Sequence, residues 1–367
     1  MAEYKTLVKK IPVSPDKKTK QKDYLKKGQL PIVDQGQSLV GGYTDDADMA
    51  VKCELPVIVF GDHTRAVKYI TFPFGAGADG IKVLQPKENI LPLFLYYATQ
   101  YIVAKMPNRG YARHYQYVEK EDLPVPPLPE QERIVARIEE LFSQLDAGVE
   151  TLKKTKAQLA VYRQAVLKEA FEKVSARVLL GSISESRLGK MLDSEKNIGV
   201  PRRYLRNINV RWHSFDLSDL SEMPIEENEV DKYSLRKGDL VICEGGEPGR
   251  CAVWESDDVI FYQKALHRVR FTDSSNPKFY MYYFWYAAQT GQLKSLFTGT
   301  GIKHLTGQSL VKVLVPTAER ITQDSIVNEI ETHLSVCDSI EQTVDIALQQ
   351  AEAMRQSILK DAFEGRL

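Results

Sequence analysis

A long segment in the middle of the sequence returns near its C-terminal end, and this repeat constrains the fold more than any other feature. Residues 131–172 align with residues 323–364 without a gap, at a constant offset of about 192 residues. The longest matched block is QAVLKEAFE (164–172), which aligns with QSILKDAFE (356–364). Self-similarity of this length at one offset indicates an internal duplication. We therefore expect the chain to contain two copies of one structural unit.

Both copies carry the heptad pattern of a long helix, and neither contains proline. The main apolar row consists of Ile138, Leu145, Leu152, Leu159 and Val166 in the first copy and Ile330, Cys337, Val344, Ala351 and Ile358 in the second. A second row consists of Ile134, Leu141 and Tyr162, with Ile326, Ile340, Ala347 and Met354. The pattern predicts helices of roughly 65 Å that pair with each other and bury this stripe. The alternative is an amphipathic helix lying on its own globular domain.

Two further segments follow one common plan. Residues 56–70 (PVIVFGDHTRAVKYI) and 239–254 (DLVICEGGEPGRCAVW) each predict a buried strand, a polar turn with arginine at its end, and another strand. An aromatic helix is expected at 91–106 and again at 276–293, with its tyrosines and Trp285 in the core. This alignment places Arg250 opposite Arg65, and Lys303 and His304 opposite Arg113 and His114.

A proline-rich stretch, Pro124 to Pro129, marks a boundary before the first long helix. We expect a globular domain at 1–126, a long helix at 127–175, a second globular domain at 176–316 and a second long helix at 317–367. The expected fold is α+β, a pseudo-two-fold tandem repeat. In it, two globular α/β domains lie at opposite ends of an antiparallel two-helix coiled coil. Two similar domains at a fixed separation suit the reading of two half-sites about 34–36 Å apart on duplex DNA.

The composition narrows the class of protein. A chain of 367 residues with 43% hydrophobic and 27% charged residues is expected to be soluble and to form more than one domain. The four cysteines lack CxxC spacing, and no signal peptide or membrane-length apolar run is evident, so a cytoplasmic location is expected. The formal net charge is zero, but the globular blocks are mildly basic and the last helix is acidic. This balance argues against non-specific coating of DNA and leaves room for local basic faces.

The first 27 residues contain nine lysines and three acidic residues. This bias predicts either a solvated, partly mobile arm or an arm that contacts phosphates.

The sequence lacks the motifs of methyltransferases, of phosphate-loop ATPases and of metal-dependent enzymes. FPFGAGADG (72–80) has the wrong spacing for a methyltransferase cofactor loop, and no Asn/Asp-Pro-Pro site follows it. No GxxxxGK[ST] phosphate loop occurs, and the six histidines show no metal-ligand spacing. We therefore expect a chain that is not an enzyme by itself, with no catalytic, cofactor or metal site of its own.

Polar turns with arginine, histidine and amide side chains are the candidate DNA-reading positions, since these groups bond base edges and phosphates. In the first domain they are Gln35, Gln37, His63, Thr64, Arg65, Arg109, Arg113 and His114. In the second they are Arg202, Arg203, Arg206, Glu247, Arg250, Lys264, Lys303 and His304. Each could equally be a solvated loop charge or part of an internal ion pair. Arg65 and Arg250 could also be structural arginines that hold their turns.

Several of these stretches together resemble the DNA-specificity subunit of type I restriction-modification systems, along nearly the whole chain. The motifs are IVDQGQ (32–37), VIVFGDHTR (57–65), GADG (77–80), PLPEQERIVARIEELF (127–142), GDLVICEGGEPGR (238–250), IKHLT (302–306) and the two helix ends. The chain departs from the pattern at its lysine-rich start, which lacks the usual leading strand segment. It departs again at VPTAERITQD (315–324), which replaces the PLPEQ wording.

The resemblance implies two target-recognition domains that each read one half of a bipartite double-stranded DNA site, with the helices setting the spacer length. It implies docking of two methylation subunits and, through them, of motor-nuclease subunits in the prokaryotic cytoplasm, for defence against foreign DNA. S-adenosylmethionine, ATP and Mg²⁺ would then belong to the partners. The alternative function is a non-enzymatic coiled-coil scaffold, or a DNA-binding adaptor outside restriction.

Overall fold

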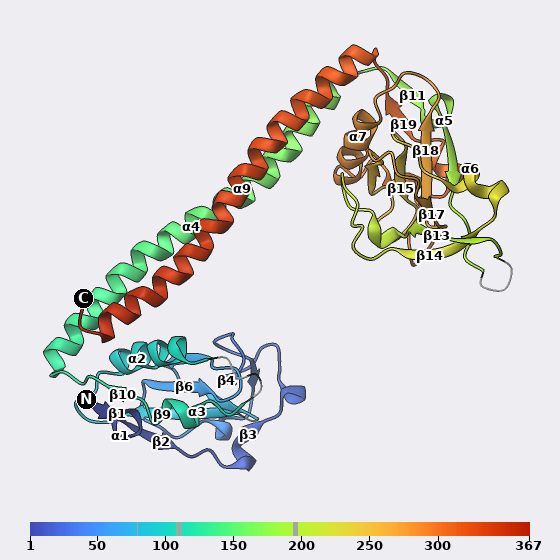
Figure 1. Cartoon of the computed structure of the whole chain (residues 1–367). Coiled ribbons are helices and arrows are strands. Elements are labelled where there is room, and N and C mark those ends of the chain that lie inside the picture. The colour runs from blue at the N-terminus through green and yellow to red at the C-terminus, as the bar shows by residue number, and fades with distance from the viewer. Residues whose placement is uncertain (79, 108–109, 111, 194–196) are drawn as a thin grey trace. The chain divides into compact units, whose positions relative to one another are not determined.

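The computed structural model describes residues 1–367 except 79, 108–109, 111 and 194–196, and its chain divides into two compact units (Figure 1). Unit 1 comprises Met1–Lys153 and Asp345–Leu367, and unit 2 comprises Lys154–Val344. Two long helices, α4 (Leu128–Glu172) and α9 (Arg320–Phe363), run through both units. The α+β class and both long helices are confirmed, and each helix begins three residues before the aligned repeat.

Among its described residues, unit 1 forms two four-stranded sheets, one two-stranded pair and several shorter helices. The first sheet is antiparallel, in the order β2 (Val8–Ile11), β9 (Ile81–Pro86), β6 (Val57–Gly61), β7 (Val67–Ile70). The second is mixed, in the order β3 (Lys18–Thr19), β8 (Gly75–Gly77), β4 (Leu30–Val33), β5 (Gly42–Thr44). The remaining elements are α1 (Tyr4–Leu7), α2 (Pro92–Lys105), α3 (Tyr115–Val118) and the paired strands β1 (Ala2–Glu3) and β10 (Asp122–Leu123).

Unit 2 repeats this plan strand for strand in its first sheet. The order is β12 (Ser184–Leu188), β18 (Leu266–Phe271), β15 (Leu240–Cys243), β16 (Cys251–Val253). The second sheet has the order β14 (Ser221–Ile225), β13 (Val200–Leu205), β17 (Phe261–Tyr262). The other elements are α5 (Leu180–Ile183), α6 (Val230–Tyr233), α7 (Pro277–Gln289), α8 (Gly307–Leu310) and the pair β11 (Arg177–Leu179) and β19 (Leu314–Pro316).

The lysine-rich N-terminus is folded, so the prediction of a partly mobile arm without a leading strand was wrong. Tyr4 is fully buried, and its hydroxyl lies 2.7 Å from Thr99 Oγ1 on α2. Strand β2 forms the edge of the first sheet, with Val8 buried while Lys9 and Lys10 are exposed. The many lysines made the apolar residues that face the core hard to recognise in the sequence. The lysines near the strand face solvent.

The repeated LKEAFE and LKDAFE motifs anchor the helix ends in the two cores. In unit 1, Phe363 at the end of α9 packs on Phe94 and Tyr101 of α2, with ring centroids 5.2 and 5.4 Å apart. In unit 2, Phe171 at the end of α4 packs on Phe279 and Tyr283 of α7, each at 5.4 Å. Each unit therefore holds the start of one long helix and the end of the other, because the aromatic helix offers the same pocket in both.

A buried glutamine fixes the start of each long helix. Gln131 accepts a hydrogen bond from Leu91 N at 2.8 Å, and its amide donates to Asn89 O and Pro126 O. Gln323, at the same repeat position, accepts from Asn276 N at 2.7 Å and donates to Ala318 O. The second copy thus keeps the glutamine contact although it lacks the PLPEQ wording, because the side chain joins the loop before the aromatic helix to the helix start.

The two long helices pair antiparallel within each unit. In unit 1, Arg355 pairs with Asp146 and lies over the Phe142 ring at 4.3 Å. In unit 2, Arg163 pairs with Asp338 at 2.6 Å and Lys173 pairs with Glu329 at 3.2 Å. A higher residue number on α4 is therefore paired with a lower residue number on α9, as expected for antiparallel helices.

Only one of the two predicted apolar rows is consistently covered. Ile138, Leu159, Ile330 and Cys337 of the main row are buried. Of the second row, Tyr162 is 44% exposed, Ile340 39% and Met354 55%, so the prediction of a fully buried stripe was wrong there. Two helices cover a narrow seam only, and the 3.6-residue turn drifts away from a seven-residue repeat.

Candidate nucleic-acid interface

In unit 1, the turn between β6 and β7 gathers polar groups from two loops. The Thr64 hydroxyl donates a hydrogen bond to Gln35 O in the loop that follows β4. In return, the Gln37 amide lies 3.5 Å from Thr64 O. Gly61 is required at the start of this turn, because a Cβ there would collide with the Thr64 hydroxyl. The turn therefore brings Gln35, Gln37 and Thr64 together, and Gln37 and Thr64 are exposed.

The two histidines of unit 1 join this turn to residues 112–115. His63 Nδ1 lies 3.1 Å from Ala112 O. His114 is fully buried, and its Nδ1 lies 3.0 Å from Asp62 O. The Asp62 carboxylate accepts from Tyr115 N at 2.8 Å and pairs with Lys82 at 3.2 Å. His114 is therefore placed to support the turn, whereas His63 is half-buried at its side.

Arginines were also predicted to contact DNA from unit 1. Arg113 is exposed beside Ala112. Arg65 adopts a left-handed backbone conformation with φ of 61°, and its guanidinium donates to Met106 O at 3.3 Å. Arg109 lies outside the residues that the structure describes. The bond from Arg65 to a backbone carbonyl is what a structural arginine would make. A phosphate contact by the same guanidinium is equally compatible with this position.

Lys68 supports this surface and was not among the predicted residues. Its side chain is 4% exposed, and its ammonium donates to Asp34 O at 2.8 Å and lies 3.5 Å from the Asp34 carboxylate. Burial lowers the pKa of Lys68, opposed by the Asp34 charge. The sequence carries one signal for it, an inward position between the partly exposed Val67 and Tyr69 on β7.

In unit 2, the corresponding turn between β15 and β16 is held by an ion-pair network. Arg250 pairs with Glu247 at 3.0 Å and donates to Asn207 Oδ1 at 2.7 Å. Asn207 in turn donates to Gly245 O. Trp212 Nε1 donates to the other Glu247 oxygen at 2.7 Å. Asn207 and Trp212 were missed, because nothing in their local sequence links them to a turn about 40 residues away.

The other predicted positions of unit 2 have separate surroundings. Arg202 pairs with Glu227 at 3.2 Å and Arg206 with Asp219 at 2.7 Å. Arg203 and Lys264 are exposed. Thus Arg202 and Arg206 are engaged in the internal ion pairs that were the alternative for them.

Lys303 and His304 lie in a turn beside the Glu247 turn. Exposed Lys303 donates to Gly299 O at 2.7 Å, and the His304 ring lies so close to Gly245 that a Cβ there would approach its Nδ1 to 3.0 Å. The structure therefore places His304 beside Gly245, at the start of the turn that carries Glu247 and Arg250. The alignment of His304 with His114 was wrong, because His114 precedes α3 as Thr306 precedes α8.

The surroundings of other titratable groups show how deeply unit 2 is packed. Burial lowers the pKa of His213 to about 4, and burial raises the pKa of the Cys243 thiol to about 11. Across the described residues, no three His, Cys, Asp or Glu side chains are grouped so that they could hold a metal ion. No helix in the described part of the chain has both the length and the apolar character needed to cross a membrane.

Sequence comparison shows which known proteins this chain is similar to. Residues 10–160 match the family described as the type I restriction modification DNA specificity domain. The chain is 26% identical over 273 residues to the EcoKI specificity subunit of Escherichia coli strain K12. It is 28% identical over 272 residues to the StySPI specificity subunit of Salmonella potsdam. Each alignment covers 67% of this chain and 58% of the relative, so the match spans less than two thirds of those proteins.

Solved structures share the fold over the whole chain. One comes from work on complex assembly and conformational transition of the type I R-M system. It has a TM-score of 0.75 and 17% identity, and covers 100% of this chain and 97% of its own. The HsdS subunit of Thermoanaerobacter tengcongensis has a TM-score of 0.58 and 18% identity, covering 100% and 96%. At this identity the likeness shows a common fold.

Proposed function

We propose that the chain, whose residues 10–160 match the type I restriction modification DNA specificity domain, is a specificity subunit that reads a bipartite duplex site, one half-site per unit. The observation that carries this proposal is the repeated hairpin. β6–β7 and β15–β16 have the same place in the same sheet order, yet they present different polar groups at their turns. One scaffold with two different turns suits recognition of two different short sequences.

In unit 1, direct base contacts are assigned to the exposed amide of Gln37 and hydroxyl of Thr64, with Gln35 and His63 beside them. Amide side chains can bond bidentately to adenine, and hydroxyls can bond several base edges. Exposed Arg113 is assigned to phosphate. Buried His114 is assigned a supporting role.

In unit 2, Glu247 is the base-reading candidate, because carboxylates accept from the cytosine amino group. Arg250 is assigned to hold Glu247 and Asn207 in place, and exposed Lys303, Lys264 and Arg203 to phosphates. Arg202 and Arg206 reach DNA in this proposal only by exchanging the carboxylates of Glu227 and Asp219 for phosphate.

The long helices are assigned to spacing and docking. They expose apolar side chains beyond the covered seam, including Val161 (66%), Val336 (54%) and Met354 (55%). Exposed apolar side chains of this kind suit further helices laid along the pair. We assign the exposed apolar side chains of the helices in each unit to contacts with two methylation subunits, which would bring S-adenosylmethionine chemistry, while ATP and Mg²⁺ would act in the motor-nuclease subunits. In this proposal the chain is non-catalytic, with recognition domains at 1–126 and 176–316 and helices at 127–175 and 317–367.

The test is selection of bound duplexes from a random library by the chain co-expressed with its methylation subunits. The proposal predicts two short enriched blocks separated by a spacer of constant length and arbitrary sequence. Affinity should fall steeply with salt, as it does for a protein with several phosphate contacts. A single uninterrupted block would contradict one half-site per unit, and no enrichment would favour the scaffold alternative.

A further inference from the structure

The lysine-rich segment of unit 1 belongs to its second sheet. Strand β3 (Lys18–Thr19) pairs with β8, and the helical turn η2 (Gln21–Asp23) follows it. Leu25 then bridges to Tyr43 on β5 through two main-chain hydrogen bonds of 2.9 Å. The exposed lysines of this segment are Lys20, Lys22, Lys26 and Lys27. Folding therefore fixes the main chain that carries these four cations at the protein surface.

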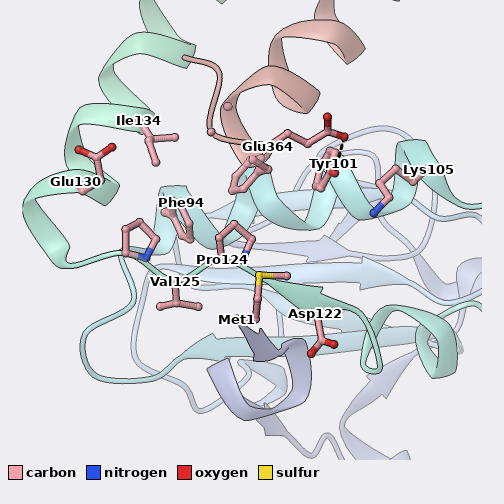
Figure 2. Close-up of a pocket in the computed structure, with 14 residues that line it drawn as sticks. Met1, Phe94, Tyr101, Lys105, Asp122, Pro124, Val125, Glu130, Ile134 and Glu364 are labelled. Carbon is pink, nitrogen blue, oxygen red and sulfur yellow. Dashed lines mark hydrogen bonds between the residues drawn. The ribbon is translucent and has the colours of Figure 1, made fainter.

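These four ammonium groups form no ion pair with any residue that the structure describes. Other lysines of unit 1 have internal partners. Lys82 pairs with Asp62 at 3.2 Å. Lys105 pairs with Glu121 at 3.7 Å, and its ammonium lies 4.8 Å from the centre of the Tyr101 ring on the same helix (Figure 2). The four lysines of the segment are therefore free to bind anions from outside the chain.

The shared fold does not require cations at this place. In unit 2, Lys190 forms the equivalent parallel bridge to the second sheet, with Gln263, but it is buried and pairs with Glu229. The two residues after it are Met191 and Leu192, with exposed fractions of 59% and 49%. The free cations of residues 20–27 are therefore an addition made by the sequence of unit 1.

Asp34 joins the lysine-rich segment to the loop that carries Gln35 and Gln37. Its carboxylate accepts hydrogen bonds from Gly36 N at 2.9 Å and from the Tyr24 hydroxyl at 3.4 Å. Burial and the Asp34 charge raise the pKa of Tyr24 to about 12, so this hydroxyl remains a donor at neutral pH. The segment and the base-reading loop are therefore held together by one carboxylate.

We propose that residues 20–27 bind the phosphates of duplex DNA beside the half-site of unit 1, an inference that rests on the proposed function. Lysine ammonium groups hold phosphates without reading sequence. A groove of about 470 Å³ is lined by Tyr24 and Lys26 of the segment and by residues 40–43, which follow the reading loop. Because Asp34 ties the two parts together, these phosphate contacts position Gln37 against the base edges.

The test is the salt dependence of binding, measured by titrating the full-length protein with a fluorescent duplex of unrelated sequence. The double variant Lys22→Gln with Lys26→Gln should reduce the slope of log K against log salt concentration by about 1.8, because each lost phosphate contact removes about 0.9. Glutamine keeps the length and polarity of these exposed side chains, so the fold should be unaffected.

Lys87→Gln with Lys120→Gln is the matched control, because it removes the same charge from exposed positions of unit 1 outside the segment. Its slope should equal that of the unmodified protein. An unchanged slope for the Lys22 and Lys26 variant would overturn the proposal, as would equal reductions in both double variants. Library selection with the unmodified protein reports on half-site reading separately, so two enriched blocks with an unchanged slope would overturn the phosphate surface alone.

Discussion

The two hairpin turns close with the same kind of main-chain hydrogen bond, but they differ in length, with residues 62–65 inside the bond in unit 1 and 244–249 in unit 2, and in how side chains hold them. Gly61 N donates to Ala66 O at 2.8 Å in unit 1, and Cys243 N donates to Arg250 O at 2.8 Å in unit 2. Around this common closure, unit 1 uses a hydroxyl and amides, whereas unit 2 uses the Arg250–Glu247 ion pair. The comparison teaches that one closing main-chain bond accommodates turns of different length and with different side chains, which leaves the exposed side chains available for recognition.

The largest expected effect tests the feature that the units share most closely, the glutamine at each helix start. Gln131→Ala should destabilise the protein by about 3 kcal/mol, because three backbone groups lose their partner, and Gln323→Ala by about 2 kcal/mol. Urea denaturation measures both, with exposed Gln356→Ala as the control. Equal urea midpoints for Gln131→Ala and Gln356→Ala would show that the Gln131 hydrogen bonds do not stabilise the protein.

The next effect is a pH dependence of folding stability that arises from a buried histidine in unit 2. Burial lowers the pKa of His213 to about 4, below its ordinary value of about 6.5, so folding keeps the imidazole neutral. The unfolded chain binds the proton more readily, and stability should fall by roughly 2 kcal/mol as pH drops from 7 to 5.

His213→Asn is the matched variant, because asparagine tolerates the positive φ of 67° at this position. It should lower stability at pH 7 and flatten the pH dependence, measured as urea midpoints in unit 2. An unchanged slope between pH 7 and 5 would contradict a neutral, buried His213.

A smaller effect concerns the two arginines that end the turns. Arg250→Ala should weaken binding to one half-site about tenfold, because Glu247 and Asn207 lose the group that orders them. Arg65→Ala, which removes one bond to Met106 O, should weaken binding to the other half-site about threefold. Competition titrations with duplexes altered in one half at a time measure these losses. Equal losses for both variants would make the two arginines equivalent.

The smallest effect lies in the helix pair. Lys173→Ala removes a fully exposed contact with Glu329 in unit 2 and should leave the free energy of unfolding nearly unchanged. Arg355→Ala removes both the Asp146 pair and the Phe142 contact in unit 1 and should cost about 1 kcal/mol. Thermal unfolding in low and high salt separates them, since only the first should vanish in salt. A larger cost for Lys173→Ala would reverse this order.

Most of the fold could be predicted from the periodic apolar patterns and the internal repeat of the sequence. The heptads and the constant offset located both long helices, and short continuous apolar runs located β6 and β15, because these patterns are local. The N-terminal strand was missed where lysines outnumbered the few residues that face the core. The second apolar row was misjudged because heptad spacing alone does not fix how much of a helix its partner covers.

The candidate sites were predictable in position and less so in role. The polar turns at 61–65 and 244–250 could be located from the strands that flank them. That Arg250 bonds Asn207, or that Lys68 bonds Asp34, depends on loops that meet only in the folded chain. His114 is buried and His63 is half-buried, although the sequence alone made both equal candidates for DNA contact.

The division of reading between the units is tested most directly by library selection with one variant in each turn, assembled with the methylation subunits. Gln37→Ala should relax base preference in one enriched block and leave the other block and the spacer unchanged. Glu247→Gln should relax the other block alone, because its carboxylate belongs to the turn of unit 2. Relaxation of both blocks by either variant would contradict the assignment of one half-site to each unit.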